Sequence, residues 1–122
     1  MATILVAEDN HTNRKLLVFI LEHAGHLVLQ ADDGAAAIAA VRRRPPDLIV
    51  MDVQMPGMDG ITATGMLKAD DTTAGIPVVA LTAHAMKGDE EKLLAAGFQG
   101  YLAKPFRHDD LLAVVAAALL AA

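Results

Sequence analysis

Short apolar runs alternate along this chain with segments whose apolar residues recur at helical spacing. A run of about five residues rich in Val, Ile and Leu suits a strand that is buried on both faces. Such runs predict five strands, at Thr3–Ala7, Leu27–Ala31, Asp47–Asp52, Pro77–Leu81 and Gln99–Leu102. The intervening segments predict five helices, between the capping residues 10–12 and Gly25, at Ala35–Arg44, at Gly60–Ala69, at Met86–Ala96, and from Asp109 to the C-terminus.

Regular alternation of strand and helix with short connections is typical of a parallel sheet that is covered by helices on both faces. Five such units predict an α/β fold, a doubly wound (βα)5 parallel sheet with the flavodoxin-like strand order 2-1-3-4-5. A length of 122 residues suits a single domain, and we expect this domain to span residues 1–122.

Polar side chains follow the carboxyl ends of four predicted strands. Glu8 and Asp9 follow the first strand, Asp52 ends the third, Thr82 follows the fourth, and Lys104 follows the fifth. In the order 2-1-3-4-5 these strands are neighbours, so we expect the five side chains to converge at one edge of the sheet. Three crowded carboxylates repel one another and favour a bound cation, and an oxygen-only ligand set suits Mg²⁺.

Each of these residues also has a simpler interpretation. Glu8 and Asp9 are placed to cap the first helix, and Asp52 is placed to begin a turn. Thr82 is a candidate cap for the fourth helix, and Lys104 is a candidate surface lysine, although the Lys-Pro step after a buried strand indicates a fixed position.

Taken together, a carboxylate, a cation, an ammonium group and a hydroxyl group form a site for phosphoryl transfer. Asp52 is the candidate nucleophile, and the metal and Lys104 would neutralise charge on the transferring group. Thr82 would hydrogen-bond a phosphoryl oxygen and couple modification to the position of its loop. His11, Arg14 and Lys15 on the first helix either steer a phosphohistidine donor or form a solvated face.

The composition of the chain limits the cellular compartment and the kinds of partner that we expect. The chain has no cysteine, which excludes disulfides and thiolate metal sites and is consistent with the cytoplasm. A net charge of −5 argues against direct binding to nucleic acid. No apolar stretch reaches the roughly 20 residues of a membrane span, and no basic segment of a signal peptide opens the chain, so we expect neither membrane insertion nor export.

Four motifs resemble those of the response-regulator receiver domains of two-component signalling, and the resemblance covers the whole chain. The motifs are Val6-Ala7-Glu8-Asp9-Asn10, Met51-Asp52-Val53-Gln54-Met55-Pro56-Gly57-Met58-Asp59-Gly60, Ala80-Leu81-Thr82-Ala83 and Tyr101-Leu102-Ala103-Lys104-Pro105-Phe106. They stand in the order and spacing of the family. The resemblance implies that Asp52 accepts a phosphoryl group from a phosphohistidine of a histidine kinase or a histidine phosphotransfer protein.

The resemblance also implies roles for the surrounding residues. Mg²⁺ would be bound by the side chains of Asp9 and Asp52 and by the backbone carbonyl of Gln54, with Glu8 acting mainly through water. Lys104 would contact the phosphoryl group, and the Lys104–Pro105 bond is expected to be cis. Thr82 and Tyr101 match the switch pair of the family. Gln54 and His84 match the two variable positions that tune the lifetime of the phosphoryl group.

A receiver of this length acts by binding other proteins. It is not expected to be an enzyme with turnover, because it assists only its own phosphorylation and dephosphorylation. The segment 82–91 resembles stand-alone receivers of the cell-division type, and Met1 favours that reading, whereas the segment 8–13 resembles receivers attached to hybrid kinases.

The expected output surface is formed by the fourth helix, fifth strand and fifth helix. The fifth helix carries no charge from Leu111 onward. Either this face is covered by a second copy of the chain or a docked partner helix, or alanine is present there only for its helix propensity.

Two other function classes fit parts of the pattern. A Mg²⁺-dependent phosphohydrolase with an aspartyl-phosphate intermediate would place a second acid two residues after the nucleophile, where this chain has Gln54, and would need a cap for which there is no spare length. An adaptor that works without phosphorylation would have no need for the five site residues.

Overall fold

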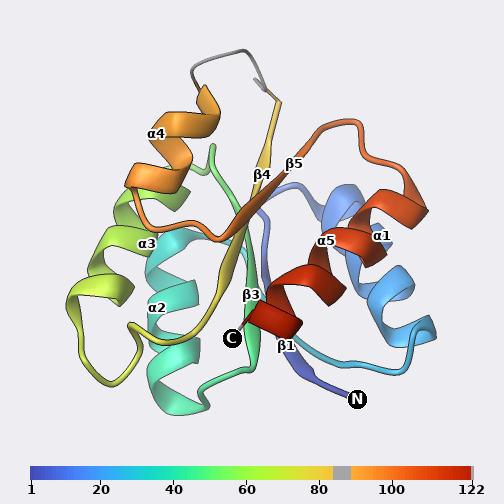
Figure 1. The fold of residues 1–122 in the computed structure, drawn as a ribbon, viewed down its shortest axis with the longest axis horizontal. Helices are drawn as coiled ribbons and strands as arrows, with labels where there is room; N and C mark the ends of the chain where they lie inside the picture. The colour runs from blue at the N-terminus through green and yellow to red at the C-terminus, as the bar shows by residue number, and fades with distance from the viewer. Residues whose placement is uncertain (84–88, 122) are drawn as a thin grey trace.

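The computed structural model describes residues 1–83 and 89–121, which form alternating strands and helices (Figure 1). The strands are β1 (Thr3–Ala7), β2 (Leu27–Ala31), β3 (Leu48–Asp52), β4 (Val78–Thr82) and β5 (Gly100–Ala103). The helices are α1 (His11–His23), α2 (Gly34–Arg43), α3 (Gly60–Ala69), α4 (Asp89–Ala95) and α5 (His108–Ala121). In the described ranges, no helix is both long enough and apolar enough to cross a membrane.

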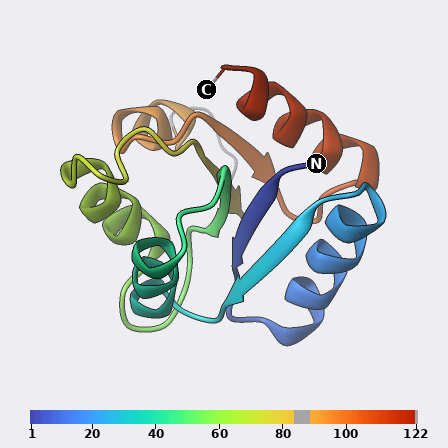
Figure 2. The same cartoon turned by 90° about the horizontal axis from the view of Figure 1, so that it is seen from below.

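The strands form one parallel sheet in the order β2-β1-β3-β4-β5. Helices α1 and α5 cover one face, and α2, α3 and α4 cover the other, as the two ribbon views show (Figures 1 and 2). The predicted fold class and strand order are therefore confirmed. From β1 the chain adds β2 on one side, and it then adds β3, β4 and β5 on the other side, so the strand order reverses between β1 and β3. Ligands of such sheets bind at the carboxyl ends of the strands beside this switch point.

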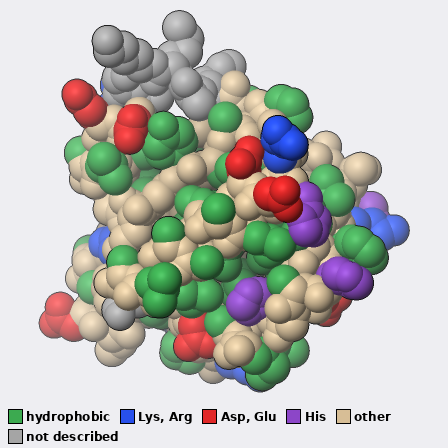
Figure 3. Space-filling view, turned by 45° about the vertical axis from the view of Figure 1, so that its right-hand side comes forward, with side chains coloured by type: hydrophobic (Ala, Val, Ile, Leu, Met, Phe, Trp, Pro, Cys, Tyr) green, Lys and Arg blue, Asp and Glu red, His purple; other side chains and the backbone are tan. Residues whose placement is uncertain are grey.

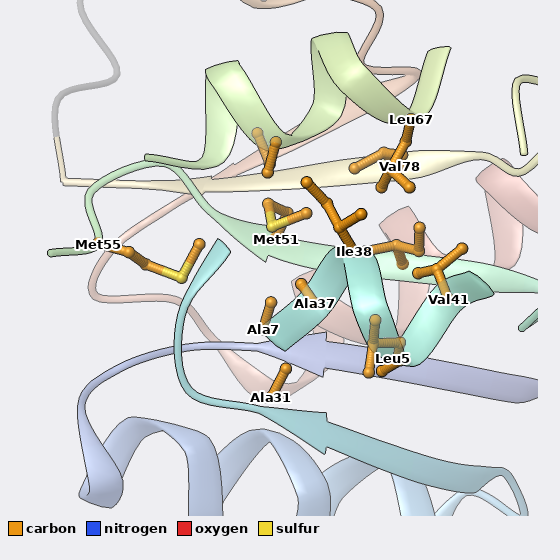
Figure 4. Close-up of a cluster of buried hydrophobic side chains, with 14 of the residues drawn as sticks. Leu5, Ala7, Ala31, Ala37, Ile38, Val41, Met51, Met55, Leu67 and Val78 are labelled. Carbon is orange, nitrogen blue, oxygen red and sulfur yellow. The ribbon is translucent and has the colours of Figure 1, made fainter. Parts of the chain in front are cut away.

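The core has two layers, one on each face of the sheet. Along β3, Ile49 and Met51 point into the layer that contains α2, α3 and α4, whereas Leu48 and Val50 point into the layer beneath α1 and α5. Figure 4 shows part of the first layer, in which Ile38 and Val41 of α2 and Leu67 of α3 lie over the sheet. Because β1, β3 and β4 are covered on both faces, their sequences are apolar except at one end, where Thr3, Asp52 and Thr82 stand.

The predicted ends of several elements were wrong by one residue. Asp47 lies before β3 and is exposed, and its carboxylate accepts a hydrogen bond from the backbone N–H of Thr3 at 2.7 Å. Pro77 precedes β4 because it has no N–H for the sheet, although its carbonyl accepts from Ile49 at 2.9 Å. Strand β5 is shifted by one residue toward the C-terminus, to Gly100–Ala103.

The helix starts also differ from the prediction. Helix α2 starts at Gly34 because the Asp33 side chain caps it by accepting from the N–H of Ala36 at 2.7 Å. Helix α5 starts at His108, which places the acidic Asp109 and Asp110 in its first turn. Helix α4 is described from Asp89, and residues 86–88 of its predicted range lie outside the described residues.

Helix α3 begins in direct contact with the backbone of Asp52. The N–H of Gly60 donates to the carbonyl of Val53 at 2.9 Å. A Cβ at position 60 would overlap the carbonyl oxygen of Asp52 and would lie 2.9 Å from its carbonyl carbon. The absence of a side chain at Gly60 therefore lets α3 pack against the end of β3.

We expect Gly60→Ala to lower the free energy of unfolding by about 1–3 kcal/mol, because the added methyl group must displace backbone. The matched control is Gly65→Ala in the same helix, where a Cβ meets no atom within 4 Å. There the higher helix propensity of Ala should raise stability by up to about 1 kcal/mol. Urea unfolding measures both changes, and equal effects of the two substitutions would contradict the close contact.

Candidate phosphoryl-transfer site

The carboxyl ends of β1, β3, β4 and β5 place the predicted site residues together. Glu8 follows β1, Asp52 is the last residue of β3, Thr82 is the last residue of β4, and Lys104 follows β5. These four strands are consecutive neighbours in the sheet. The ends of these strands therefore lie at one edge of the sheet, as the strand-end pattern predicts.

The Lys104 ammonium lies between two buried carboxylates. Its Nζ is 3.1 Å from Oε2 of Glu8 and 3.1 Å from Oδ2 of Asp52. Glu8 is 1% exposed and Asp52 is 2% exposed, so both carboxylates are shielded from bulk water. Asp9 is exposed beside them, and one carboxylate oxygen from each of the three acids lies within 4.8 Å of the others.

Burial and close charges oppose one another in this cluster. Burial is the largest influence on Glu8 and raises the pKa of its carboxyl group. The hydrogen bond from Lys104 lowers this pKa and the negative charge of Asp52 raises it, and the net result is a raised pKa. Burial is also the largest single influence on Lys104 and by itself would lower its pKa. The hydrogen bonds and charges of Asp52 and Glu8 together outweigh burial, so the pKa of the Lys104 ammonium is raised.

Backbone groups hold the two buried carboxylates in place. The N–H of Asn10 donates to Oε1 of Glu8 at 3.2 Å, and the N–H of Gln54 donates to Oδ1 of Asp52 at 3.2 Å. Asn10 is itself the cap of α1, because its side chain accepts from the N–H of Asn13 at 2.9 Å. The first helix thus does not use Glu8 or Asp9 as its cap.

Lys104 is held by its own backbone. Its N–H donates to the carbonyl of Thr82 at 2.8 Å, which extends the pairing of β4 with β5 by one residue. The Lys104–Pro105 peptide bond is cis, as the family resemblance predicts. Lys104 is thus a fixed residue at the sheet edge and not an ordinary surface lysine.

Thr82 and Tyr101 lie on neighbouring strands. Thr82 is 5% exposed. The predicted start of the fourth helix, which Thr82 is a candidate to cap, lies outside the described residues. Tyr101 in β5 is half-buried and packs against the core layer beneath α2, α3 and α4. Gln54 is exposed in the loop after β3, and His84 lies outside the described residues.

The donor set fits a hard divalent cation. The three acids offer only oxygen ligands, which Mg²⁺ prefers, and the exposed Asp9 leaves one side of the cluster open to the water that Mg²⁺ retains. Oε2 of Glu8 is buried, and the Lys104 ammonium lies 3.1 Å from it. Three carboxyl groups against one ammonium leave an excess of acid that a divalent cation would balance.

Comparison with known proteins decides the family. A model of the response regulator receiver domain matches residues 4–116. This chain belongs to the response-regulator receiver family. The polar-differentiation response regulators DivK of Brucella anthropi and Brucella ovis are 41% and 40% identical to it over 103 residues, with 84% of each chain covered. The chain is therefore a receiver domain of phosphorelay signalling.

Solved receiver structures share the fold over nearly the whole chain. The chemotaxis protein CheY4 of Vibrio cholerae is 29% identical with a TM-score of 0.91, over 97% of this chain and 98% of its own. The receiver domain of the sensor histidine kinase PA1611 of Pseudomonas aeruginosa is 36% identical with a TM-score of 0.89, over 97% of each chain. That structure has a magnesium ion coordinated in its active-site cleft.

The sequence interpretation missed one polar contact of the site. The sequence predicts either a steering role or a solvated position for Arg14, but it is half-buried, and its Nη1 donates to the carbonyl of Glu8 at 2.8 Å. The available signal was its place in the first turn of α1, six residues after Glu8, where a long side chain can fold back over the preceding loop. Spacing alone does not show which acceptor it finds.

The raised pKa of Glu8 predicts how metal-free stability depends on pH. The folded protein holds this proton more tightly than the unfolded chain, whose carboxyl group titrates near 4.5. The contribution of Glu8 to stability is thus largest below pH 4.5 and is lost as pH rises through the raised pKa. We expect Glu8→Gln to be more stable than wild type at pH 7, with a gain that shrinks toward pH 4.5.

Chemical unfolding in the presence of a chelator measures this difference. Glu22→Gln removes one exposed carboxylate from α1 and controls for the change in net charge. A Glu8→Gln protein that is less stable than wild type at pH 7 would show that the ionised Glu8 is favoured by its surroundings, contrary to the direction of the pKa shift.

Proposed function

We propose that this receiver is a Mg²⁺-dependent phosphoryl-acceptor switch, in which Asp52 takes a phosphoryl group from a histidine kinase or a histidine phosphotransfer protein. The observation that carries the proposal is the Lys104 ammonium, which lies 3.1 Å from a carboxylate oxygen of Asp52 at the edge of the sheet. A buried carboxylate beside a fixed cation is suited to attack an electrophilic phosphorus whose oxygens the same cation can then bind.

In the proposed step, a carboxylate oxygen of Asp52 forms a bond to the phosphorus of a phosphohistidine. The phosphorus–nitrogen bond of the donor breaks, and its electron pair remains on the imidazole nitrogen, which takes up a proton. Lys104 moves its hydrogen bond from the Asp52 carboxylate to an oxygen of the transferred group. The N–H of Gln54 keeps the carboxylate oriented, since it already donates to Oδ1 of Asp52.

The residues that would hold Mg²⁺ are the side chains of Asp9 and Asp52, the backbone carbonyl of Gln54, and Glu8 through water. When bound, the metal neutralises negative charge on the phosphoryl oxygens. The magnesium ion in the cleft of the PA1611 receiver supports this assignment, as does the clustering of the three acids.

Thr82 and Tyr101 would convert phosphorylation into a change of surface. The hydroxyl group of Thr82 would hydrogen-bond a phosphoryl oxygen and draw the end of β4 toward Asp52, and the Tyr101 ring would turn further inward. By the resemblance to the family, Gln54 and His84 would tune the lifetime of the phosphoryl group.

The proposal places one receiver domain over residues 1–122, in the cytoplasm. It assists its own phosphorylation and dephosphorylation and does not turn over a separate substrate. The similarity to the DivK regulators favours a stand-alone receiver, and the similarity to the PA1611 domain keeps a receiver of a hybrid histidine kinase as the second candidate.

A small phosphodonor tests the central step. Incubation with acetyl phosphate and Mg²⁺ should add one acid-labile phosphoryl group, detected as a single mass increase. Asp52→Asn should remove the increase, because its amide cannot act as the nucleophile. Asp47→Asn, an exposed aspartate at the other end of β3, is the matched control and should leave it intact.

The other function classes give different results in this experiment. Many turnovers of donor per chain would favour the phosphohydrolase, and a wild-type chain that gains no phosphoryl group would favour the adaptor. Either result would overturn the proposed acceptor role.

The output surface is proposed to be the face formed by α4, β5 and α5, where a downstream protein target would bind. On α5 the outward stripe consists of Ala113, Ala116, Ala117 and Leu120, all exposed, and Leu120 is 87% exposed. Figure 3 brings forward the side of the molecule that carries α1 and α5, and hydrophobic side chains occupy much of the middle of that view.

In a chain of net charge −5, an uncharged stripe lets two copies meet without like-charge repulsion, so we propose a homodimer through α5.

Sedimentation of the phosphorylated and unphosphorylated chain tests this contact. We expect wild type to form a dimer and Leu120→Glu to be monomeric, because the substitution buries two like charges at the twofold contact. Leu94→Glu changes another exposed leucine, on α4, and should leave the dimer in place. If wild type and Leu120→Glu are identical monomers in both states, the homodimer is excluded.

A further inference from the structure

The junction between β2 and α2, residues 30–34, carries none of the proposed ligands or switch residues. It nevertheless contacts both loops that carry the proposed metal ligands. One contact reaches the loop after β1, which bears Glu8 and Asp9. The other reaches the loop after β3, which bears Gln54 and ends at the start of α3.

The first contact fixes both peptide groups of Glu8. The backbone N–H of Glu8 donates to the carbonyl of Ala31 at 3.1 Å. Its carbonyl accepts from Nη1 of Arg14 at 2.8 Å, and Nε of Arg14 in turn donates to the side-chain oxygen of Gln30 at 3.3 Å. The planar guanidinium group therefore links the Glu8–Asp9 peptide to the end of β2.

The partners of Arg14 show that it does not neutralise the acids. Its third contact is with Nδ1 of His11, 3.3 Å from Nη2. Within residues 1–83 and 89–121, no carboxylate forms an ion pair with Arg14, although Glu8 and Asp9 are close in sequence. Two of its partners are uncharged oxygens, those of the Glu8 carbonyl and the Gln30 side-chain amide, so the arginine orients the loop and leaves the carboxylates available for a cation.

The second contact is steric. A Cβ at Gly34 would lie 2.5 Å from the carbonyl oxygen of Met58 and 3.1 Å from its Cβ. The start of α2 thus touches the backbone of the loop after β3, and only glycine allows this approach without moving the loop. The same loop donates the Gln54 N–H to the carboxylate of Asp52.

We propose that the β2–α2 junction, acting through Arg14 and Gly34, positions the two loops that form the Mg²⁺ site and so sets the metal affinity of this receiver. Arg14 and Gly34 are positioning residues, because each acts through backbone that carries a ligand and neither touches the metal or the phosphoryl group. The inference rests on the proposed function, since it concerns the same metal site.

Partners that orient metal ligands typically change metal affinity by about 10- to 100-fold when they are removed. For Arg14→Ala we expect the dissociation constant for Mg²⁺ to rise by about tenfold, because the backbone of Glu8 keeps its N–H contact with Ala31 but loses the contact at its carbonyl. The rate of phosphorylation by acetyl phosphate at saturating Mg²⁺ should stay within about threefold of wild type, because Asp52 and Lys104 are untouched.

Titration of Mg²⁺ followed by amide chemical shifts measures the dissociation constant without any phosphodonor. The matched control is Arg42→Ala, which removes the same charge from an exposed residue at the end of α2 that pairs with Asp70 at 3.8 Å. Arg14→Lys keeps the charge but lacks the planar group that reaches several acceptors, so its affinity should remain near that of Arg14→Ala. Full recovery of affinity in Arg14→Lys would overturn the orienting role.

Gly34→Ala tests the second loop, with Gly65→Ala as the control for adding a methyl group to an open helix position. We expect Gly34→Ala to weaken Mg²⁺ binding and to shift the Gln54 amide resonance in the metal-free protein, whereas Gly65→Ala should do neither. Circular dichroism establishes that each variant is folded at the temperature of the titration. If Gly34→Ala does not fold, Gln30→Ala takes its place and should weaken Mg²⁺ binding through the loss of the Arg14 contact.

Measurements on the wild-type protein distinguish a failure of the proposed function from a failure of the positioning role alone. A wild-type chain that binds no Mg²⁺ and accepts no phosphoryl group would refute the proposed function itself. A wild-type chain that binds Mg²⁺, together with folded Arg14→Ala and Gly34→Ala variants of unchanged affinity, would refute only the positioning role. Equal weakening by Arg14→Ala and Arg42→Ala would also refute it, because the effect would then follow net charge.

Discussion

The bridge that Lys104 makes between Glu8 and Asp52 is the interaction on which the site depends. Two carboxylates that are each almost fully buried repel one another and lose most of their hydration. One ammonium at 3.1 Å from both compensates part of that cost. At Glu8 the effect of burial exceeds that of the Lys104 ammonium, and the pKa of its carboxyl group is raised. Additional positive charge would therefore stabilise the ionised carboxylates of the cluster. A fold that concentrates acid in this way is suited to binding a divalent cation and a phosphoryl group together.

The parallel sheet explains why this costly cluster forms at all. The strands β3 and β4 are buried along their length, β1 is buried except at Thr3, and β5 is only partly buried. All four end at the same edge of the sheet, so polar residues at or just after their ends lie near one another there. Apolar packing on both faces supplies the rigidity, and the close approach of Gly60 to Asp52 fixes the start of α3 against the strand that carries the proposed acceptor. Stability thus resides in the two core layers, and chemistry resides at the edge.

The sequence allowed the fold and most of the site to be predicted because both depend on local patterns. Five apolar runs identified five strands, and the strand-end rule identified Glu8, Asp52, Thr82 and Lys104. The errors at Asp47 and Pro77 arose because both residues contact a neighbouring strand while lying outside their own. The roles of Arg14 and Gly34 were not predictable, since they depend on distances between β2, α2 and two loops that no spacing in the chain encodes.

The most direct test of the Lys104 bridge is a crystal structure of the protein with Mg²⁺ and beryllofluoride, which mimics a phosphoryl group on aspartate. We expect beryllium bound to a carboxylate oxygen of Asp52, the Lys104 ammonium about 3 Å from a fluorine atom, and the metal bound by Asp9 and Asp52. A structure in which Lys104 makes no contact with the beryllofluoride group, or in which this group binds away from Asp52, would contradict the central role of the bridge.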